Sequence, residues 1–429
     1  MRGTRQVSIA LLDINDSNLQ LWFGGDRVQS PGYALLEGRD YHFGGPARAA
    51  ARLRPRDINT RYWWQLSTEP LQPALGPARH TADLVHAHLL DLHRQAGEPA
   101  EVVLAVSGSM QREQLALLLG IVQQCPFDAV GMVNRSVALG SMYPAAGRLF
   151  HLEIQLHQAL LAELSTGEGR VELRRSVPLP GCGMLQLQER LVETIAAAFI
   201  RQTRFDPRRK AATEQQLYDA LPGTLRALGR DAETNLEVNG YRARLNRTEL
   251  LGAGQRLFTS VPEAMGGAQA EDRIITDPIA GLLPGLLERL PGPEVLPPEA
   301  LYMALNQHRD RLVQRGEALA FVTSLPCLGE PASHRPEQSR PEPMTESFSA
   351  PTHLLQGNRA LPLAPAGTEI GPDCRLCRDD NGWQLRGDSG SVRVNGGHWR
   401  HERPLRAGDA ITTGSGAQLL LIEVVPDGG

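Results

Sequence analysis

The sequence predicts an α/β protein: a large N-terminal body, a linker and a small all-β domain at the C-terminal end. Two observations predict the body. Apolar strand-like segments alternate with long amphipathic helices up to residue 327, and 41% of the 429 residues are hydrophobic, which is enough for sizeable cores. A third observation predicts the small domain, because short strand-like segments separated by Gly, Asp and Asn turns fill residues 351–429.

The elements of the body follow from the periodicity of apolar residues. Residues 7–12 and 19–23 are predicted to form a hairpin of two strands across the turn from Asp13 to Asn18. A strand at 316–325 is predicted to be the last buried strand of the body. Between them we expect helices at 81–95, 185–202 and 214–228, a strand at 101–106 followed by a helix, a strand at 148–154 and a hairpin around Gly167–Gly169.

A change in composition separates the body from the small domain. The segment from Gly329 to Ala350 is rich in Pro, Ser, Glu and Arg, with Met344 and Phe348 as its only large apolar residues. Such a segment buries too little apolar surface to offset the entropy lost on ordering, so we predict a disordered linker. The expected domains are therefore 1–327, a linker at 328–350, and 351–429.

Composition also excludes several classes of function. The formal net charge is −4, which leaves no basic surplus for nucleic acid, and no apolar stretch approaches 18 residues, so we expect no membrane span. Of the 44 basic residues only Lys210 is lysine, and no P-loop is present. The five cysteines are too sparse for a disulfide framework and no signal peptide is recognisable, so we expect a cytoplasmic protein.

Two stretches of the body are similar to one another. Residues 9–18 (IALLDINDSN) and 149–157 (LFHLEIQLH) each form an apolar strand that ends in acid–Ile–amide and is followed by a turn. Such a repeat, each copy opening a hairpin, resembles the actin-like ATPase superfamily, and the DnaK-type heat-shock chaperone branch fits best. Residues 43–60, 102–112 and 134–139 (NRSVAL) are similar to successive motifs of that branch, the last to its Asn-Glu-Pro-x-Ala-Ala run. The resemblance covers residues 5–326 and implies a two-lobed fold around a nucleotide pocket.

The resemblance also implies which residues would bind Mg²⁺ and ATP if the pocket is retained. Glycines of the two phosphate hairpins let backbone N–H groups approach the phosphates, while acidic residues order Mg²⁺ and the attacking water. The register of the second hairpin leaves two alternatives for its acidic position, Glu153 or His151. The candidate cofactor-binding residues are Asp13, Asn15, Asp16, Ser17, Asn18, Glu153, Gln155, Thr276 and Asp277.

Four departures from the family pattern predict that turnover has been lost. Asn15 and Gln155 replace the hairpin glycines, and Thr276-Asp277 replaces the glycines of the adenosine loop. The phosphate-contacting lysine is absent, because the matching stretch holds only arginines such as Arg61. We therefore expect no catalytic residues and no bound cofactor, and we interpret Asp13 as a hairpin turn residue rather than a metal ligand. The peptide-binding module of the chaperones is absent as well.

The C-terminal domain resembles a forkhead-associated (FHA) domain, a β-sandwich whose loops bind phosphothreonine. The resemblance rests on Val394-Asn395-Gly396 and on residues 405–414 (LRAGDAITTG). Pro372 stands where the family has its phosphate-clamping arginine, and residues 378–382 (RDDNG) replace its Ser-x-x-His signature. We therefore expect a sandwich used for protein contacts, with Arg386 and Arg393 as the anion-binding alternative.

Three further clusters contain residue types that occur in metal-binding or catalytic sites. Cys374-x-x-Cys377 and His398-x-x-His401 carry zinc-ligand types, but residues three apart in a strand point to opposite faces, so we predict no metal. Ser107-Gly108-Ser109 is interpreted as a helix cap. The histidines His86, His88 and His93 are interpreted as solvated residues of a surface helix.

Three hypotheses about function follow. The first is a non-catalytic interaction or scaffold protein built on a degenerate DnaK/actin-like fold, with protein partners and a possible homo-oligomer. The second is a slow or divergent Mg-ATP-dependent chaperone-like or filament-forming ATPase, in which Asp13, Ser17 and Glu153 bind Mg–ATP. The third is a phosphopeptide-binding adaptor.

Overall fold

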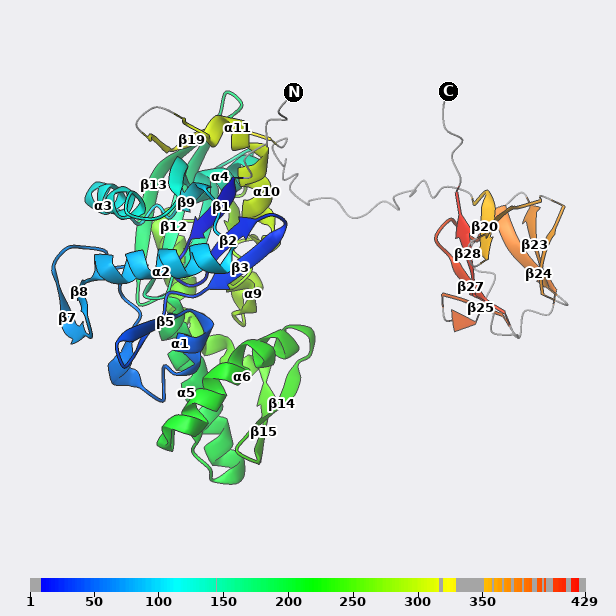
Figure 1. Ribbon diagram of the computed structural model, residues 1–429. Coiled ribbons are helices and arrows are strands. Elements are labelled where there is room, and N and C mark those ends of the chain that lie inside the picture. Colours follow the sequence, from blue (N-terminus) through cyan, green and yellow to red (C-terminus); the bar gives the residue numbers. More distant parts are fainter. Residues whose placement is uncertain are drawn as a thin grey trace. The chain divides into compact units, whose positions relative to one another are not determined.

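The computed structural model divides the chain into two compact units, Met1–Pro336 and Glu337–Gly429. The first unit combines helices with mixed sheets, and the second is all-β, as the sequence predicts (Figure 1). The predicted linker lies outside the described residues apart from Leu328. The described residues are 9–143, 145–315, 319–328, 351–356, 359–364, 366–371, 374–379, 382–387, 392–395, 397–398, 404–413 and 418–423.

The first lobe of unit one is built on a six-stranded sheet with the order β18-β10-β9-β1-β2-β3. Strand β1 is parallel to β9 and antiparallel to β2, and every residue of β1 is buried, as is typical of a central strand covered on both faces. Helices α2 (Thr81–Gln95) and α3 (Arg112–Val122) pack on this lobe (Figure 1). The strands are β1 (Ala10–Ile14), β2 (Leu19–Phe23), β3 (Asp26–Ser30), β9 (Glu101–Val106), β10 (Asp128–Asn134) and β18 (Phe321–Val322).

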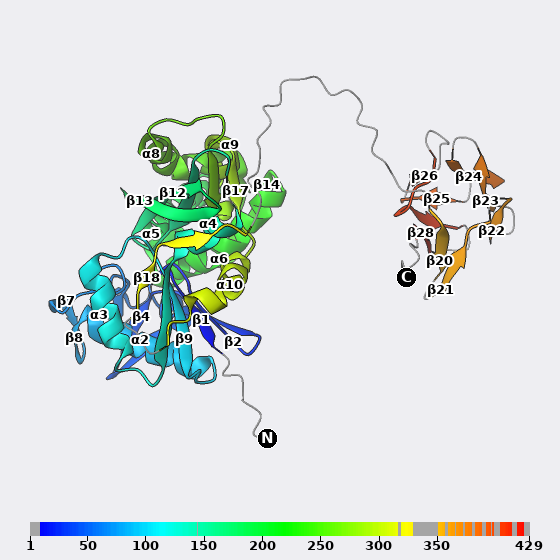
Figure 2. The same cartoon turned by 90° about the horizontal axis from the view of Figure 1, so that it is seen from above.

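The second lobe repeats this topology. Its sheet has the order β17-β16-β11-β12-β13-β19, and β11 is parallel to β16 and antiparallel to β12, as β1 is to β9 and β2. Figure 2 shows first-lobe elements such as α2, α3 and β9 on one side and second-lobe elements such as β12 and β13 on the other. The strands are β11 (Leu149–Ile154), β12 (Gln158–Gly167), β13 (Arg170–Pro180), β16 (Arg273–Thr276), β17 (Pro293–Val295) and β19 (Ser324–Pro326).

Smaller elements are inserted into each lobe. The first lobe carries a sheet β5-β4-β6, the hairpin β7–β8 and helix α1, while the second carries α5, α6, the hairpin β14–β15 and α8 (Figure 1). Their bounds are β4 (Ala34–Glu37), β5 (Asp40–Phe43), α1 (Gly45–Ala49), β6 (Ile58–Asn59), β7 (Pro70–Leu75), β8 (Ala78–His80), α5 (Met184–Thr203), α6 (Ala211–Arg230), β14 (Glu233–Val238), β15 (Tyr241–Asn246), α7 (Arg247–Leu250), α8 (Gln255–Met265) and α9 (Leu286–Arg289).

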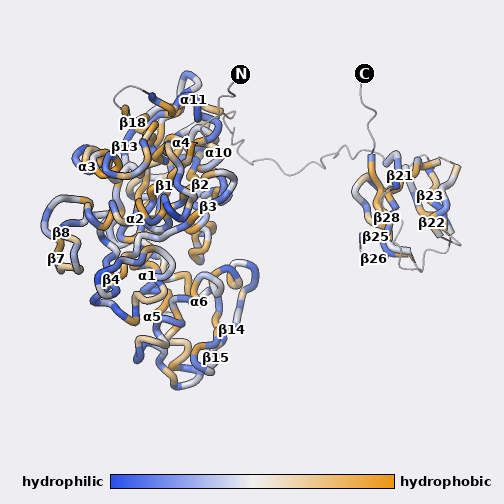
Figure 3. The backbone as a smooth tube through the Cα atoms, viewed as in Figure 1, coloured by the Kyte–Doolittle hydropathy of each residue, from blue (hydrophilic) through white to orange (hydrophobic). Residues whose placement is uncertain are grey.

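A shared core joins the two lobes. Val103 and Val133 of the first sheet belong to the same buried cluster as Leu149, Leu164 and Ile275 of the second. Helices α4 (Arg135–Met142) and α10 (Ala300–Gln307), the latter followed by α11 (Arg309–Leu312), complete this cluster. In Figure 3, β1, α4 and α10 lie together in a largely hydrophobic part of the chain. The ends of β1 and β11 are therefore held at fixed positions next to one another.

Most sequence-predicted elements of the body are present, but the last strand is not. Strands β2 and β9 and helix α2 have the predicted bounds, and β11, α5 and α6 agree within a few residues. Residues 316–318 lie outside the described residues, and the rest of 316–325 forms two short, partly exposed strands. Strand β18 pairs with β10 of the first lobe and β19 with β13 of the second, so this segment passes from one sheet to the other. The apolar run at 316–325 therefore contributes an edge strand to each of the two sheets and does not form a single buried strand.

Unit two contains two antiparallel sheets, with the orders β21-β20-β28-β27-β25-β26 and β22-β23-β24. Trp383, Leu376 and Leu421 contribute to the core between them. The strands are β20 (His353–Gln356), β21 (Arg359–Pro362), β22 (Thr368–Gly371), β23 (Cys374–Asp379), β24 (Gly382–Gly387), β25 (Arg393–Val394), β26 (Gly397–His398), β27 (Ala410–Thr412) and β28 (Gln418–Ile422). Across the described part of the chain, no helix is long and apolar enough to span a membrane.

Candidate functional site

Two acidic side chains lie at corresponding ends of β1 and β11. Asp13 pairs with Gln20 of β2, and Glu153 pairs with Leu160 of β12, so each acidic residue faces the residue seven positions further along its hairpin. The two hairpins therefore have the same register, and Glu153, rather than His151, is the counterpart of Asp13. Asp277 follows β16, the parallel neighbour of β11, and lies at the same edge of the sheet. Asp13 belongs to a strand, so its interpretation as a turn residue is wrong.

Arg135 lies between these three carboxylates. It is the first residue of α4, and the side chain of Asn134 caps this helix by accepting the N–H of Val137. Arg135 Nε donates to Asp13 Oδ1 at 2.7 Å, and Nη1 and Nη2 donate to the two oxygens of Asp277 at 2.9 and 2.7 Å. The third carboxylate, of Glu153, lies 3.6 Å from Arg135 Nη1. We call Arg135, Asp13, Glu153 and Asp277 the arginine cluster.

The arginine cluster is buried, and the pKa values of its carboxyl groups are shifted in different directions. Burial raises the pKa of Asp13 to about 6, although the charge of Arg135 partly opposes this. Burial also tends to raise the pKa of Asp277, but Arg135 and, to a smaller degree, His151 outweigh burial and hold this pKa well below its ordinary value. Burial tends to lower the pKa of Arg135, but the three carboxylates outweigh burial and raise this pKa well above its ordinary value, so the guanidinium stays charged. The cluster thus contains its own cation at the point where the lobes meet.

The tips of the two hairpins bind one another directly. Asn15 Nδ2 donates to the carbonyl oxygen of Ile154 at 3.3 Å, and the N–H of Leu156 donates to Asp16 Oδ1 at 2.8 Å. Within the first hairpin, the backbone N–H and the hydroxyl of Ser17 both donate to Asn15 Oδ1. We call the contacts Asn15–Ile154 and Asp16–Leu156 the hairpin latch. The backbone N–H groups of Ser17 and Leu156 and the Ser17 hydroxyl, which could otherwise donate to a phosphate, thereby donate to side chains of the protein itself.

Gln155 fills the place next to Glu153. Its Nε2 lies 2.9 Å from Glu153 Oε1, 2.7 Å from Ser107 Oγ and 2.9 Å from Ser109 Oγ. The two serines therefore connect the lobes, and the interpretation of Ser107-Gly108-Ser109 as a helix cap is wrong, because α3 is capped at Gln111. Thr276 donates its hydroxyl proton to the carbonyl oxygen of Leu152 at 2.8 Å.

The structure brings all nine sequence-predicted site residues together, but with different partners from those expected. Eight of them are bound through their side chains to other protein groups at distances up to 3.6 Å, and the ninth, Asn18, lines the adjacent cavities. The residue missed from the sequence is Arg135. A signal was present, because the resemblance of residues 134–139 to the Asn-Glu-Pro-x-Ala-Ala run places Arg135 at its glutamate. Arg61, which lies in the stretch where the resemblance implies a lysine, is exposed and lies outside the cluster.

The interpretation of His86, His88 and His93 as solvated residues is wrong for two of the three histidines. His88 is fully buried: Trp63 Nε1 donates to its Nδ1 at 3.1 Å, so its Nε2 donates to Ser30 Oγ at 2.7 Å. Burial lowers the pKa of His88 to about 3, and the ring stacks on Phe43 at 4.8 Å. His93 is buried as well and lies 3.0 Å from the carbonyl oxygen of Pro99. Both are structural residues.

Two cavities flank the arginine cluster on the side of α6. One, of about 400 Å³, is lined by Asp13, Arg135 and Asp277, and the other, of about 380 Å³, lies between α5 and α6. Asn18 and Arg226 line both. The residues do not fit Mg–ATP, because the carboxylates bind Arg135 and the hairpin tips bind each other.

In unit two, only some of the residues named in the sequence analysis lie within the described residues. Cys374 is buried in the core and Cys377, three residues along the same strand, is partly exposed. Pro372 and His401 lie outside the described residues. The Nη2 atom of Arg386 is 3.9 Å from a carboxylate oxygen of Asp379.

A scan against protein-family models finds no match, and no curated protein matches the chain.

Proposed function

We propose that the protein is a non-catalytic scaffold for protein partners, built on an actin/DnaK-like fold whose nucleotide pocket has become a structural ion cluster. The duplicated topology supports the fold: the strand orders β3-β2-β1-β9-β10 and β13-β12-β11-β16-β17 have the same polarity. Each copy ends its first strand with an acidic residue at the interface of the lobes. This is the arrangement that the resemblance to the superfamily implies.

The observation that carries the proposal is the position of Arg135. Its guanidinium lies within 3.6 Å of all three carboxylates, of which Asp13 and Glu153 would be needed for Mg²⁺. A metal ion at the same point would have to displace a charged, buried side chain that already has bidentate partners. The lobes are therefore stabilised by the protein itself rather than by a nucleotide.

Unit two is proposed to serve as a contact module. Its two-sheet core supports the FHA-like interpretation, while the sequence lacks the arginine and the Ser-x-x-His of the phosphothreonine clamp. A phosphothreonine peptide array tests this part of the proposal. We expect no sequence-dependent signal; binding that is abolished when Arg386 and Arg393 are changed to Ala would instead indicate a phosphopeptide adaptor.

A turnover assay tests the body. We expect phosphate release from Mg-ATP to stay at the buffer background, and to be the same for the wild type and for Glu153→Gln. Release that exceeds the background and disappears in Glu153→Gln would overturn the proposal in favour of an ATPase. The matched variant is needed because it separates turnover by this site from a contaminating enzyme.

A further inference from the structure

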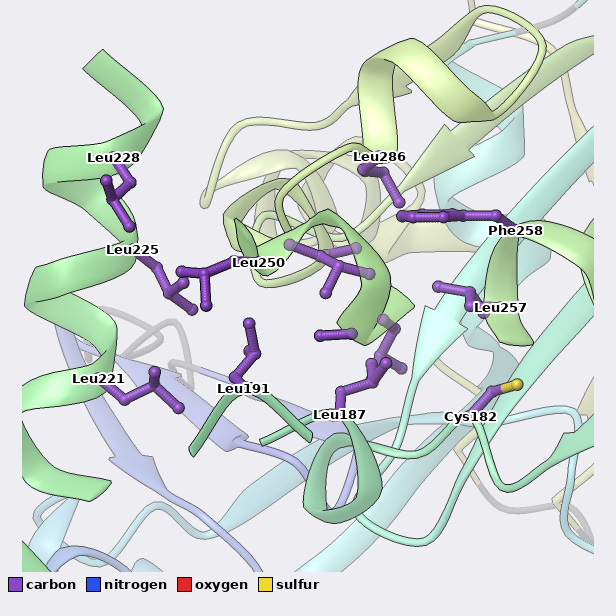
Figure 4. Packing of buried hydrophobic residues seen from close by; sticks show 14 of the residues in the cluster. Cys182, Leu187, Leu191, Leu221, Leu225, Leu228, Leu250, Leu257, Phe258 and Leu286 are labelled. Carbon is purple, nitrogen blue, oxygen red and sulfur yellow. The ribbon is translucent and has the colours of Figure 1, made fainter. Parts of the chain in front are cut away.

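The cavity between α5 and α6 has an apolar wall on both sides. Leu187 and Leu191 project from α5, and Leu221 and Leu225 project from α6 toward them (Figure 4). All four belong to the core of the second lobe and are at most 8% exposed. A volume of about 380 Å³ lies within the range of small-molecule sites. The wall therefore suits the apolar body of a small ligand.

The polar groups of this cavity are cationic or neutral. Arg48 and Arg226 line it, and no aspartate or glutamate does. Neither arginine forms an ion pair within the part of the chain that the structure describes, in contrast to Arg52 and Arg208 nearby. The neutral polar side chains of the lining are Ser17, Asn18, Gln29, Tyr33 and Gln188. Both arginines are exposed to solvent at the rim of the cavity. A negatively charged ligand group would thus meet two guanidinium groups that have no ion-pair partner among the described residues, whereas a cationic ligand would meet no acidic side chain.

From these two observations we propose that the cavity binds a small organic anion with an apolar body, such as an aromatic sulfonate or a fatty carboxylate. The apolar body lies between Leu191 and Leu221, and the anionic group binds Arg226 and Arg48. Charge-assisted hydrogen bonds from arginine to such a group are among the strongest that a protein forms. This inference goes beyond the proposed scaffold role and does not require nucleotide binding.

A pair of related fluorescent probes tests the proposal on the full-length chain. 1-Anilinonaphthalene-8-sulfonate carries the anionic group, and N-phenyl-1-naphthylamine is its uncharged counterpart. We expect the sulfonate to bind at least about tenfold more tightly, since a charge-assisted hydrogen bond is worth about 1.5–3 kcal/mol. We also expect laurate to displace it. Equal affinity for both probes would overturn the assignment of an anion.

Variants of one helix locate the site. Arg226→Gln is expected to weaken sulfonate binding about tenfold or more, whereas Arg230→Gln, an exposed residue of the same helix that does not line the cavity, should leave binding unchanged. Methyl NMR of the leucine-labelled wild type needs no variant: shifts should concentrate on Leu187, Leu191, Leu221 and Leu225. Shifts elsewhere, or unchanged binding in Arg226→Gln, would overturn the site. Displacement of the probe by Mg-ATP in an Arg226-dependent manner would assign the cavity to nucleotides instead.

Discussion

Arg135 is the residue on which the account depends most. A guanidinium that is 4% exposed would be costly alone, because a charge removed from water needs close and well-oriented partners. Asp13 and Asp277 supply them from opposite lobes, at distances down to 2.7 Å. One side chain thus neutralises acidic groups of two lobes and joins those lobes.

Replacing Arg135 by Met is expected to lower the free energy of unfolding by about 3–5 kcal/mol at pH 8, because three buried carboxylates then lack the guanidinium that they share. The loss should be smaller at pH 5, where these carboxylates take up protons. Chemical denaturation at both pH values measures it. Arg94→Met is the control: Arg94 pairs with Asp91 at the surface, and its loss should cost at most about 1 kcal/mol. Equal effects of the two substitutions would show that the cluster is not essential to the fold.

Asp16 makes stability depend on pH. Burial raises its pKa to about 7 from an ordinary value of 3.8, so between these pH values the native state holds a proton that the unfolded state has lost. Stability therefore falls as pH rises through this window, and Asp13, with a pKa of about 6, acts in the same direction. Asp277 acts in the opposite direction, but its depressed pKa places the loss of its contribution below about pH 4.

Asp16→Asn is expected to raise the free energy of unfolding at pH 8 by about 1–4 kcal/mol and to flatten its pH dependence between about pH 4 and 7, where only the native state keeps this proton. The amide oxygen of Asn can still accept the N–H of Leu156. The measurement is a series of urea titrations from pH 5 to pH 8. A variant less stable than the wild type at pH 8 would mean that the charge of Asp16 stabilises the latch.

At the scale of elements, two groups of polar contacts between the lobes lie on either side of the cavities. The arginine cluster and the hairpin latch join β1, α4 and β11, and Arg52, which follows α1, contacts α5 and α6 further out. The guanidinium carbon of Arg52 lies 3.8 Å from the centre of the Tyr218 ring, and its Nη2 is 3.5 Å from Glu189 Oε2. The backbone N–H of Arg52 also donates to Gln215 Oε1 at 2.9 Å. The interface is thus closed by protein contacts on both sides of the cavities.

Arg52→Ala is expected to speed amide hydrogen exchange in residues 45–52 and in the first half of α6, while global stability falls by only about 1 kcal/mol, because the contacts are partly exposed. Arg208→Ala provides the control. Arg208 also binds Glu189, at 3.1 Å, but lies within the second lobe, so residues 45–52 should keep their exchange rates. Faster exchange of residues 45–52 in both variants would mean that Arg52 does not hold the lobes together.

The features that could be predicted from the sequence are those set by residues close together in the chain. Strand β2 and helix α2 were predictable because apolar periodicity is a local signal. His88 could have been placed in the core, because it lies four residues after Leu84 and four before Leu92 on the buried face of α2. The partners of Arg135 could not, because Asp277 is 142 residues away and only the fold brings it near. The division of 316–325 between two sheets could not be predicted either, because the strands that pair with this segment, β10 and β13, are far away in the sequence.

At the scale of the whole molecule, the two units have separate cores and separate chemistry. Unit one holds a duplicated α/β fold, and ion pairs of Arg135 with Asp13 and Asp277 stabilise the interface between its two lobes. Unit two has an all-β core that includes Trp383. The proposed scaffold role would use a surface on each of the two units.

Calorimetric titration of the full-length protein with Mg-ATP tests the central claim most directly. The account predicts no heat of binding up to millimolar nucleotide at pH 7.5, because Arg135 already neutralises the carboxylates that would hold the metal. Titration with a denaturant confirms in parallel that the sample is folded. A saturable heat with a micromolar dissociation constant, lost in Asp13→Asn, would contradict the account.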